Sequence, residues 1–254
     1  MGGRTTRYEV KYRIPLDEAE DLMRWVSQRM RSDDFGEGGK ASYSVHSLYL
    51  DDARWSIYDD TRLGAFDRFK LRARTYGFSP GDNVFLEVKR REGELMWKTR
   101  AEVPRAEAAR VISGDAPQNL PWTPALEAFR AEVDRRQAVP RVWVSYRREA
   151  WVGEDRGNLV RITFDSNVRC APPTSALTEP AAWYPLPDVA GIVILELKYS
   201  GSYPGWIADM VRQFELERKS MSKYRHSVDV LLSNGFAMMA GRPRQAMPGT
   251  GEVA

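Results

Sequence analysis

The sequence predicts a single α+β domain in which antiparallel strands close into a tunnel-shaped barrel and amphipathic helices pack on its outside. Three observations support this fold class. Charged and apolar residues alternate with a period of two in several segments, which is typical of strands that have one face of each kind. Other segments carry the apolar spacing of an amphipathic helix. Stretches rich in Gly and Pro separate these elements.

Eight segments are predicted to be strands: 7–14, 43–50, 68–75, 86–89, 97–100, 142–152, 160–165 and 195–199. The alternation is clearest in the first and third of them. In 7–14, charged residues occupy every odd position, namely Arg7, Glu9, Lys11 and Arg13. In 68–75, basic residues occupy every even position, namely Arg68, Lys70, Arg72 and Arg74. Because alternate residues of a strand point to opposite sides, each strand presents one charged and one apolar face.

Helices are predicted at 16–31, 124–136, 204–214 and 222–234, with Pro204 in a first turn and Gly235 as a stop. The connections are predicted at 33–39, 77–83, 113–124 and 172–188. From residue 241 onward the sequence is rich in Pro, Gly and polar residues and shows no period, which is typical of disorder. The domain is therefore predicted to span 1–240, followed by a disordered tail at 241–254.

Composition restricts the functional classes. The 254 residues carry 38 basic and 35 acidic side chains, and a net charge of +3 is too small to attract anions in bulk. Any anion site must therefore come from a local arrangement. Cys170 is the single cysteine, which excludes an intramolecular disulfide and a cysteine-based zinc site. No apolar run approaches the roughly 20 residues of a membrane span, and no signal-peptide core is present, so a cytoplasmic location is expected.

The charged faces point to a phosphate ligand. Neighbouring side chains on one face of 68–75 are only about 7 Å apart, so its four basic residues repel one another unless anions lie between them. A solvated outer face is the alternative for any one strand. Helices that cover the apolar faces would instead turn the charged faces into the lumen. A linear phosphate chain suits such a lumen, because Arg binds phosphate bidentately and Lys supplies point charges. Double-stranded nucleic acid is too wide for it.

Carboxylates accompany these cations on the predicted charged faces: Glu9, Glu87, Glu196 and Asp165. Oxygen ligands of this kind suit Mg²⁺ or Mn²⁺ bound together with phosphate, and at least one of them is expected to bind metal. The alternative is that each pairs with a neighbouring Lys or Arg. No GxxxxGK, HExxH or GxSxG motif occurs, and His46 and His226 are expected on a strand and a surface helix. Phosphoryl transfer fits this inventory because it relies on positioning and charge stabilisation.

Nine short motifs occur in order between about residues 7 and 235: RYEVKYRI, SLYLDD, FKLRARTY, VFLEVKR, MWKTR, VSYRREAW, VRITFD, ILELKYSG and MSKYRHS. The set resembles the polyphosphate polymerase domain of the vacuolar transporter chaperone (VTC) family, within the CYTH-like triphosphate tunnel metalloenzymes. The resemblance implies a tunnel that binds a nucleoside triphosphate and a growing polyphosphate chain. It also implies transfer of the γ-phosphate of ATP with Mn²⁺ or Mg²⁺.

Position by position, the resemblance implies these phosphate-binding cations: Lys11, Arg72, Arg74, Lys89, Lys98, Arg148, Arg161, Lys198 and Lys223. Tyr146 and Ser222 would add hydroxyl donors, and Glu196 falls on the metal-binding glutamate of the family. Glu87 is a second metal candidate, and Glu9 is expected beside the substrate. The alternation predicts the inward face for every strand cation except Arg148. One departure is that the wider superfamily often carries two glutamates before its lysine (ExExK), whereas here Glu9 stands alone before Val10 and Lys11, a reduction that the polymerase branch shares.

The sequence therefore favours synthesis of polyphosphate from ATP. The first rival is hydrolysis of tripolyphosphate or a nucleoside triphosphate, with water as the acceptor. The second is a non-catalytic polyphosphate or nucleotide binding module, against which Glu196 argues. A nucleic-acid partner is not expected, because the alternation places most Trp and Tyr away from the cations.

No regulatory SPX domain or membrane helix is evident in the 254 residues, so synthesis coupled to translocation by this chain alone is not expected. A separate membrane protein is a candidate partner, which would hold the domain at the inner face of a membrane. The sequence leaves open the phosphate acceptor, the product length, the preferred metal and the oligomeric state.

Overall fold

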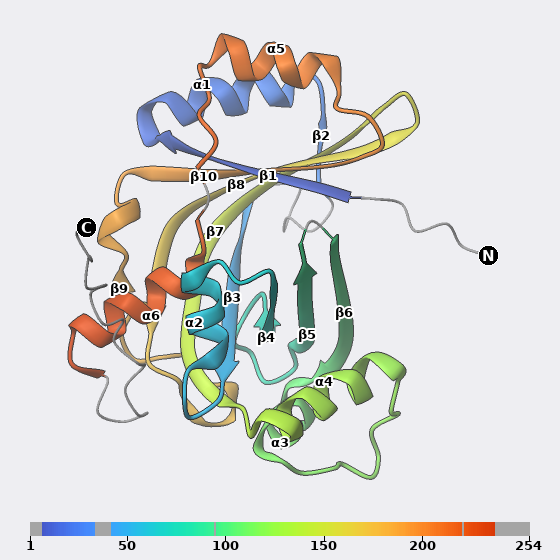
Figure 1. Cartoon of the computed structure of the whole chain (residues 1–254), viewed down its shortest axis with the longest axis vertical. Helices are drawn as coiled ribbons and strands as arrows, with labels where there is room; N and C mark the ends of the chain where they lie inside the picture. The colour runs from blue at the N-terminus through green and yellow to red at the C-terminus, as the bar shows by residue number, and fades with distance from the viewer. Residues whose placement is uncertain (1–6, 34–41, 94, 220, 237–254) are drawn as a thin grey trace, which may run out of the picture.

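A computed structural model describes residues 7–33, 42–93, 95–219 and 221–236 and confirms the α+β class (Figure 1). Its strands are β1 (Arg7–Pro15), β2 (Arg31–Ser32), β3 (Ser42–Asp51), β4 (Asp67–Thr75), β5 (Asn83–Glu92), β6 (Leu95–Pro104), β7 (Val139–Asp155), β8 (Asn158–Ala171), β9 (Tyr184–Pro185) and β10 (Ile192–Ser200). In this part of the chain they form one ten-stranded sheet with the order β1-β10-β8-β7-β3-β4-β5-β6, in which β2 also pairs with β7 and β9 with β8. All pairings are antiparallel, and the sheet is strongly curled.

The helices are α1 (Leu16–Ser27), α2 (Ser56–Leu63), α3 (Arg105–Ser113), α4 (Pro124–Arg136), α5 (Gly205–Gln213) and α6 (Lys223–Ser233), with short 3₁₀ turns at Ser175–Leu177 and Pro187–Val189. Helices α1 and α5 form a layer over one part of the sheet, outside β1, β10 and β8 (Figure 1). Helices α3 and α4 pack outside β4, β5 and β6. The apolar strand faces are thus covered by helices, as the alternation predicts.

Two apolar cores result from this arrangement. Under α1 and α5, buried residues such as Leu22 and Ile207 pack against the outer side of β1, β8 and β10. Around α3 and α4, Phe129 packs in the larger core that contains Leu71 of β4. Within β4 the burial alternates as predicted, because Phe69, Leu71 and Ala73 face this core. The intervening basic residues therefore lie on the opposite, inner face of the sheet.

Several element boundaries differ from those predicted. Helix α1 ends at Ser27 rather than at residue 31, because Arg31 and Ser32 leave the helix to pair with β7. Pro204 is the residue before α5 rather than within its first turn. Helices α2 and α3 were not predicted, and neither was β9 inside the connection at 172–188. The tail predicted from residue 241 lies outside the described residues.

The predicted closure of the sheet is also wrong in detail. Strands β1 and β6 are the two edges of the path, and no ladder joins them within the described residues. The curl instead brings β5 opposite β1, where the Lys89 ammonium lies 2.9 Å from the Glu9 carboxylate. A side-chain ion pair therefore bridges the gap that backbone hydrogen bonds would span in a closed barrel. Among the helices described, none combines the length and the apolarity needed to cross a bilayer.

Helix α6 is held in place by a buried carboxylate at the end of β3. Asp51 is fully buried and accepts hydrogen bonds from the amides of Ile57 and Tyr58 at 3.0 and 2.9 Å. It also accepts one from the Tyr224 hydroxyl at 2.6 Å. The amides belong to the first turn of α2, so Asp51 serves as its cap from outside the helix. One side chain thereby fixes both α2 and α6, and with α6 it fixes Ser222 and Lys223.

We expect Tyr224→Phe to lower the free energy of unfolding by about 1–3 kcal/mol, because Asp51 loses a donor that water cannot replace. Urea denaturation of the variant and the wild type measures this difference. Tyr184→Phe is the matched control, since the structure gives the Tyr184 hydroxyl no hydrogen bond in the described part of the chain. Equal stability of the Tyr224 variant and the wild type would show that the hydrogen bond from Tyr224 to Asp51 does not hold α6 in place.

Candidate functional site

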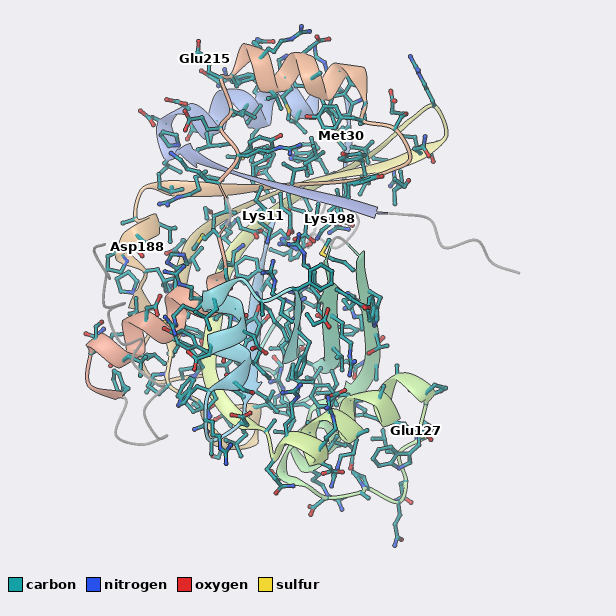
Figure 2. All side chains as sticks on the ribbon, in the orientation of Figure 1. Lys11, Met30, Glu127, Asp188, Lys198 and Glu215 are labelled. Carbon is teal, nitrogen blue, oxygen red and sulfur yellow. The ribbon has the colours of Figure 1, made fainter. Side chains whose placement is uncertain are left out.

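The inner face of the curled sheet gathers the charged residues that the sequence predicted. The strand cations stand as follows: Lys11 on β1, Arg72 and Arg74 on β4, Lys89 on β5, Lys98 on β6, Arg148 on β7, Arg161 on β8 and Lys198 on β10. Ser222 is the residue before α6, and Lys223 begins that helix. Figure 2 shows Lys11 and Lys198 directed below β1 and β10, toward the interior of the curl. Three buried carboxylates, Glu87, Asp165 and Glu196, organise these cations into three groups.

The first group surrounds Glu9 and Glu196, which lie on the neighbouring strands β1 and β10. The Lys11 ammonium lies between the two carboxylates, 3.2 Å from Glu9 Oε1 and 3.3 Å from Glu196 Oε1. Lys198 Nζ lies 3.0 Å from the other oxygen of Glu196. Burial alone would lower the pKa of Lys11, but Glu196 and Glu9 outweigh it and raise this pKa. Burial opposes ionisation of Glu196 as well, yet Lys198 and Lys11 hold its pKa well below the usual range.

The second group is centred on Asp165 of β8, which is fully buried. Arg148 binds both of its oxygens, with Nε and Nη2 at 2.7 and 2.8 Å, and Lys223 Nζ lies 2.7 Å from Oδ2. Against the effect of burial, Arg148 and Lys223 lower the pKa of Asp165 to about 2. Arg148 also approaches Glu196 to 3.7 Å and so links this group to the first. These contacts place Arg148 on the inner face of the sheet, which the alternation could not decide.

The third group is centred on Glu87 of β5, which is also fully buried. Arg72 Nε lies 2.6 Å from Oε2, while Lys98 Nζ and Arg100 Nε lie 3.0 and 3.6 Å from Oε1. Burial opposes the negative charge, but the surrounding cations, Arg72 foremost, keep the pKa of Glu87 well below its usual range. Both oxygens of Glu87 are therefore engaged by cations.

The remaining predicted residues lie beside these groups. Arg74 Nη2 lies 3.4 Å from the Tyr146 hydroxyl, which places that hydroxyl on the inner face. Arg161 pairs with Asp33 at 2.5 Å and lies 3.3 Å from the Tyr43 hydroxyl. Asp33 falls outside every alternating segment, so the alternation carries no signal for its role. The structure thus brings all the predicted site residues to one face.

Lys70 is a further inward cation, which is not among the nine that the family resemblance implies. Its ammonium donates a hydrogen bond to Ser222 Oγ at 3.0 Å and lies in register opposite Lys89. Among the described residues no carboxylate oxygen comes within 4.0 Å of it. Burial, Lys11, Lys89 and Arg72 hold the pKa of Lys70 well below its usual value. The alternating run of four cations in β4 contained this signal, but only the fold shows which of them lacks a countercharge.

The described residues contain no group of three or more His, Cys, Asp and Glu side chains that could hold a metal by itself. Glu9 and Glu196 are nevertheless adjacent, and two carboxylates are the donor set with which Mg²⁺ and Mn²⁺ bind when phosphate oxygens and water supply the other ligands. The residues present therefore fit a metal that binds together with a phosphate ligand. They do not fit one bound by protein alone.

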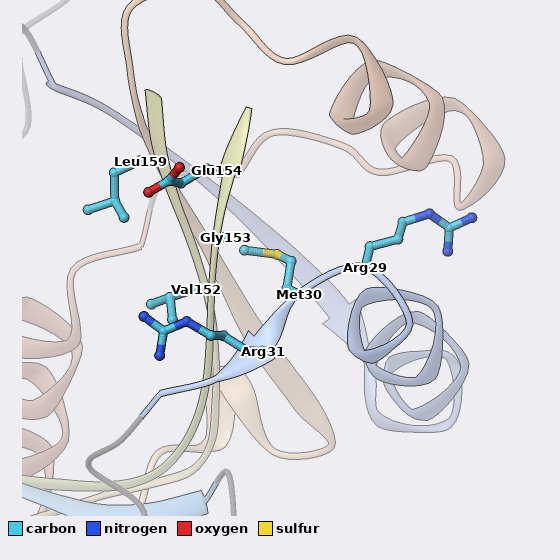
Figure 3. A pocket seen from close by; sticks show the side chains of 7 residues that line it. All are labelled: Arg29, Met30, Arg31, Val152, Gly153, Glu154 and Leu159. Carbon is cyan, nitrogen blue, oxygen red and sulfur yellow. The ribbon is translucent and has the colours of Figure 1, made fainter. Parts of the chain in front are cut away.

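A separate cavity of about 300 Å³ lies between the end of α1 and the β7–β8 hairpin (Figure 3). Its polar lining consists of Arg29, Arg31 and Glu154. None of the cations that bind Glu87, Asp165 or Glu196 lines it. The cavity is therefore distinct from the inner face of the sheet.

A family model described as the VTC domain matches residues 6–232. The chain belongs to the VTC domain family. Among solved structures, this VTC domain is similar to a Bacillus halodurans protein provisionally described as an adenylate cyclase. The two share 12% identity with a TM-score of 0.46, over 85% of this chain and 95% of the other. No curated protein matches the sequence.

We expect Lys70→Met to stabilise the VTC domain in the absence of ligand, with a gain that shrinks as pH rises. The lowered pKa of Lys70 means that the unfolded chain binds more protons than the folded protein up to the usual value of 10.5, so wild-type stability rises with pH through this group. Methionine removes that contribution, and the advantage of the variant should vanish near pH 10.5.

Urea denaturation between pH 6 and pH 10.5 measures the difference. The control is Lys219→Met, which removes an ammonium that is 57% exposed and pairs with Glu217. A constant difference across pH, or a loss of stability at neutral pH, would show that Lys70 is not under electrostatic stress.

Proposed function

We propose that this VTC domain is a polyphosphate polymerase that transfers the γ-phosphate of ATP to a growing phosphate chain on the inner face of its sheet. The observation that carries the proposal is an excess of positive charge along that face. The inner-face cations are Lys11, Lys70, Arg72, Arg74, Lys89, Lys98, Arg100, Arg148, Arg161, Lys198 and Lys223. The carboxylates that pair with them are Glu9, Asp33, Glu87, Asp165 and Glu196.

The cations outnumber the carboxylates about two to one, and they extend from β1 across the sheet to α6. A compact anion would contact only part of this face. A nucleoside triphosphate aligned with a second phosphate chain would contact more of it, because the charge of each repeats at every phosphorus. The distribution therefore supports two phosphate substrates bound together.

The residues act by orientation and charge. Guanidinium groups such as Arg72 and Arg74 can bind two phosphate oxygens each, while ammonium groups such as Lys198 follow the chain as point charges. Their carboxylate partners hold these groups in place before substrate arrives, so little reorganisation is needed at the moment of transfer. Phosphoryl transfer gains most of its rate from such positioning and from stabilisation of charge on the transferred group.

Ser222 and Lys223 extend the phosphate contacts to the beginning of α6. The Ser222 hydroxyl already accepts from the Arg225 amide and from Lys70, and an anion placed here would also face the positive end of the helix. Lys223 stays ionically engaged with Asp165 at 2.7 Å. This part of the face suits one end of a phosphate chain.

Glu196 and Glu9 are the residues that would hold a divalent cation, Mn²⁺ or Mg²⁺, against the phosphates. When bound, the metal would neutralise charge on phosphate oxygens. Glu87 is worse placed for this role, because three cations already engage its carboxylate. Its geometry supports the ion-pair role that the sequence left open.

Incubating the full chain with ATP and Mn²⁺ should give a ladder of phosphate chains of increasing length on a polyacrylamide gel. Transfer to a bound chain is expected because the excess of cations serves an acceptor phosphate as well as the donor. Release of inorganic phosphate alone would point to hydrolysis, and an unchanged ATP pool would point to a binding module; either result would contradict the polymerase.

We expect Glu196→Gln to lower turnover by about 100-fold or more, since stabilisation of charge by a metal is worth several kcal/mol. Binding of tripolyphosphate without metal should persist, because the cations stay in place. Saturating ligand at about 100 times its Kd should still raise the free energy of unfolding by roughly 2.7 kcal/mol, which thermal melts detect. Glu92→Gln, an exposed carboxylate of β5, is the control. Near-normal turnover of folded Glu196→Gln with Mn²⁺ would reject the metal role.

A further inference from the structure

Three aromatic rings line the inner face at the end of β4 away from Ser222. Tyr43 and Tyr76 lie edge to face with ring centroids 5.7 Å apart, and Tyr76 makes the same contact with Phe85 at 5.7 Å. Strand register fixes the orientation of two of them, because Phe85 stands directly opposite Arg74 and Tyr43 directly opposite Arg148, and Tyr76 contacts both rings. The sequence alternation places most aromatic residues away from the cations, and these rings are exceptions.

The aromatic cluster of Tyr43, Tyr76 and Phe85 lies at the margin of the larger core, against which Tyr43 and Tyr76 pack. Its members are only partly buried, whereas the outward neighbours of Phe85, Val84 and Leu86, are 1% and 0% exposed. Basic groups lie against the rings as well. Arg100 places its guanidinium 3.6 Å from the Phe85 centroid and 3.5 Å from the Tyr76 hydroxyl.

The aromatic cluster lies at one end of the row of inward cations on β4. Along β4 the inner face runs Lys70, Arg72 and Arg74, with steps of about 7 Å between neighbours. Tyr76 follows just after the strand ends at Thr75. Lys70 contacts Ser222 at the other end.

Rings also lie against cations nearer Ser222, because Tyr49 contacts Arg72 and Tyr146 contacts Lys223, but these two rings are 6% and 5% exposed. The inner face therefore passes from cations beside buried rings to cations beside the partly exposed rings of the cluster. A nucleoside triphosphate has the same order, from terminal phosphate to base.

We propose that Tyr43, Tyr76 and Arg100 form a nucleobase subsite, so that a nucleoside triphosphate binds with its terminal phosphate toward Ser222 and its base against these rings. The inference rests on the proposed function, because it takes the nucleotide as the phosphate donor. Flat rings and a guanidinium bind a base by stacking, which tolerates different bases but favours the larger purines. A phosphate chain without a base would not use the subsite.

The test compares the binding of ATP, UTP and tripolyphosphate to the full chain by isothermal titration calorimetry without metal. Wild-type protein should bind ATP more tightly than UTP. Tyr76→Leu should raise the Kd of ATP about tenfold, the size expected for one lost stacking contact, and leave the Kd of tripolyphosphate unchanged within twofold. Tyr76→Phe keeps the ring and should bind ATP like the wild type.

Trp97→Leu is the matched control, because this aromatic residue of β6 lies on the outer face and is 44% exposed. It should change none of the three Kd values. Equal weakening of ATP and tripolyphosphate by Tyr76→Leu would assign Tyr76 a packing role and overturn the subsite. Tripolyphosphate binding with no preference for ATP over UTP would also overturn it and leave the proposed function standing. Failure of the wild type to bind tripolyphosphate would instead contradict the proposed function itself.

Discussion

Compensation of buried positive charge is the constraint on which the inner face depends. The curl of the sheet brings inward cations of different strands close to one another. Because the space between them is partly dehydrated, these like charges repel strongly. Three carboxylates, Glu87, Asp165 and Glu196, are 0%, 0% and 7% exposed and each engages two or more cations. Their lowered pKa values show that they stay ionised despite burial. The carboxylates thus permit the cations to be packed together at all.

These ion pairs organise the site, but they are a poor source of stability. Desolvation of two charges offsets most of their attraction, so buried pairs seldom stabilise a fold as much as apolar packing does. The VTC domain accordingly builds two apolar cores. One lies outside the sheet under α1 and α5, and the larger one surrounds α3 and α4 and also packs α6 against inner-face rings such as Tyr49. Burial of these apolar side chains drives folding, and most of it occurs on the outer faces. The inner faces are left free to hold charge that a ligand can use.

Period-two alternation predicted the inner face well because strand geometry alone decides it, as the burial of Leu71 between inward basic neighbours shows. What the sequence could not supply depends on contacts across the fold. Helix α2 begins where Asp51 caps it from six and seven residues before the amides it binds, a separation beyond the local capping patterns that mark a helix start in a sequence. Arg148 follows a register shift in β7 that alternation cannot follow. Lys70 was visible as a cation, but its lack of a countercharge is a property of the curl.

The pairing of cations with carboxylates explains why the proposed reaction would need a divalent cation. Phosphate oxygens that approach Lys11 and Lys198 must also approach Glu9 and Glu196, because each ammonium is shared with a carboxylate about 3 Å away. Repulsion between carboxylate and phosphate would cancel much of the attraction that the lysines provide. A doubly charged ion between them turns both repulsive contacts into attractive ones. The carboxylates would then have two roles. They offset the repulsion between the cations in the folded protein, and they make the proposed reaction dependent on a divalent metal.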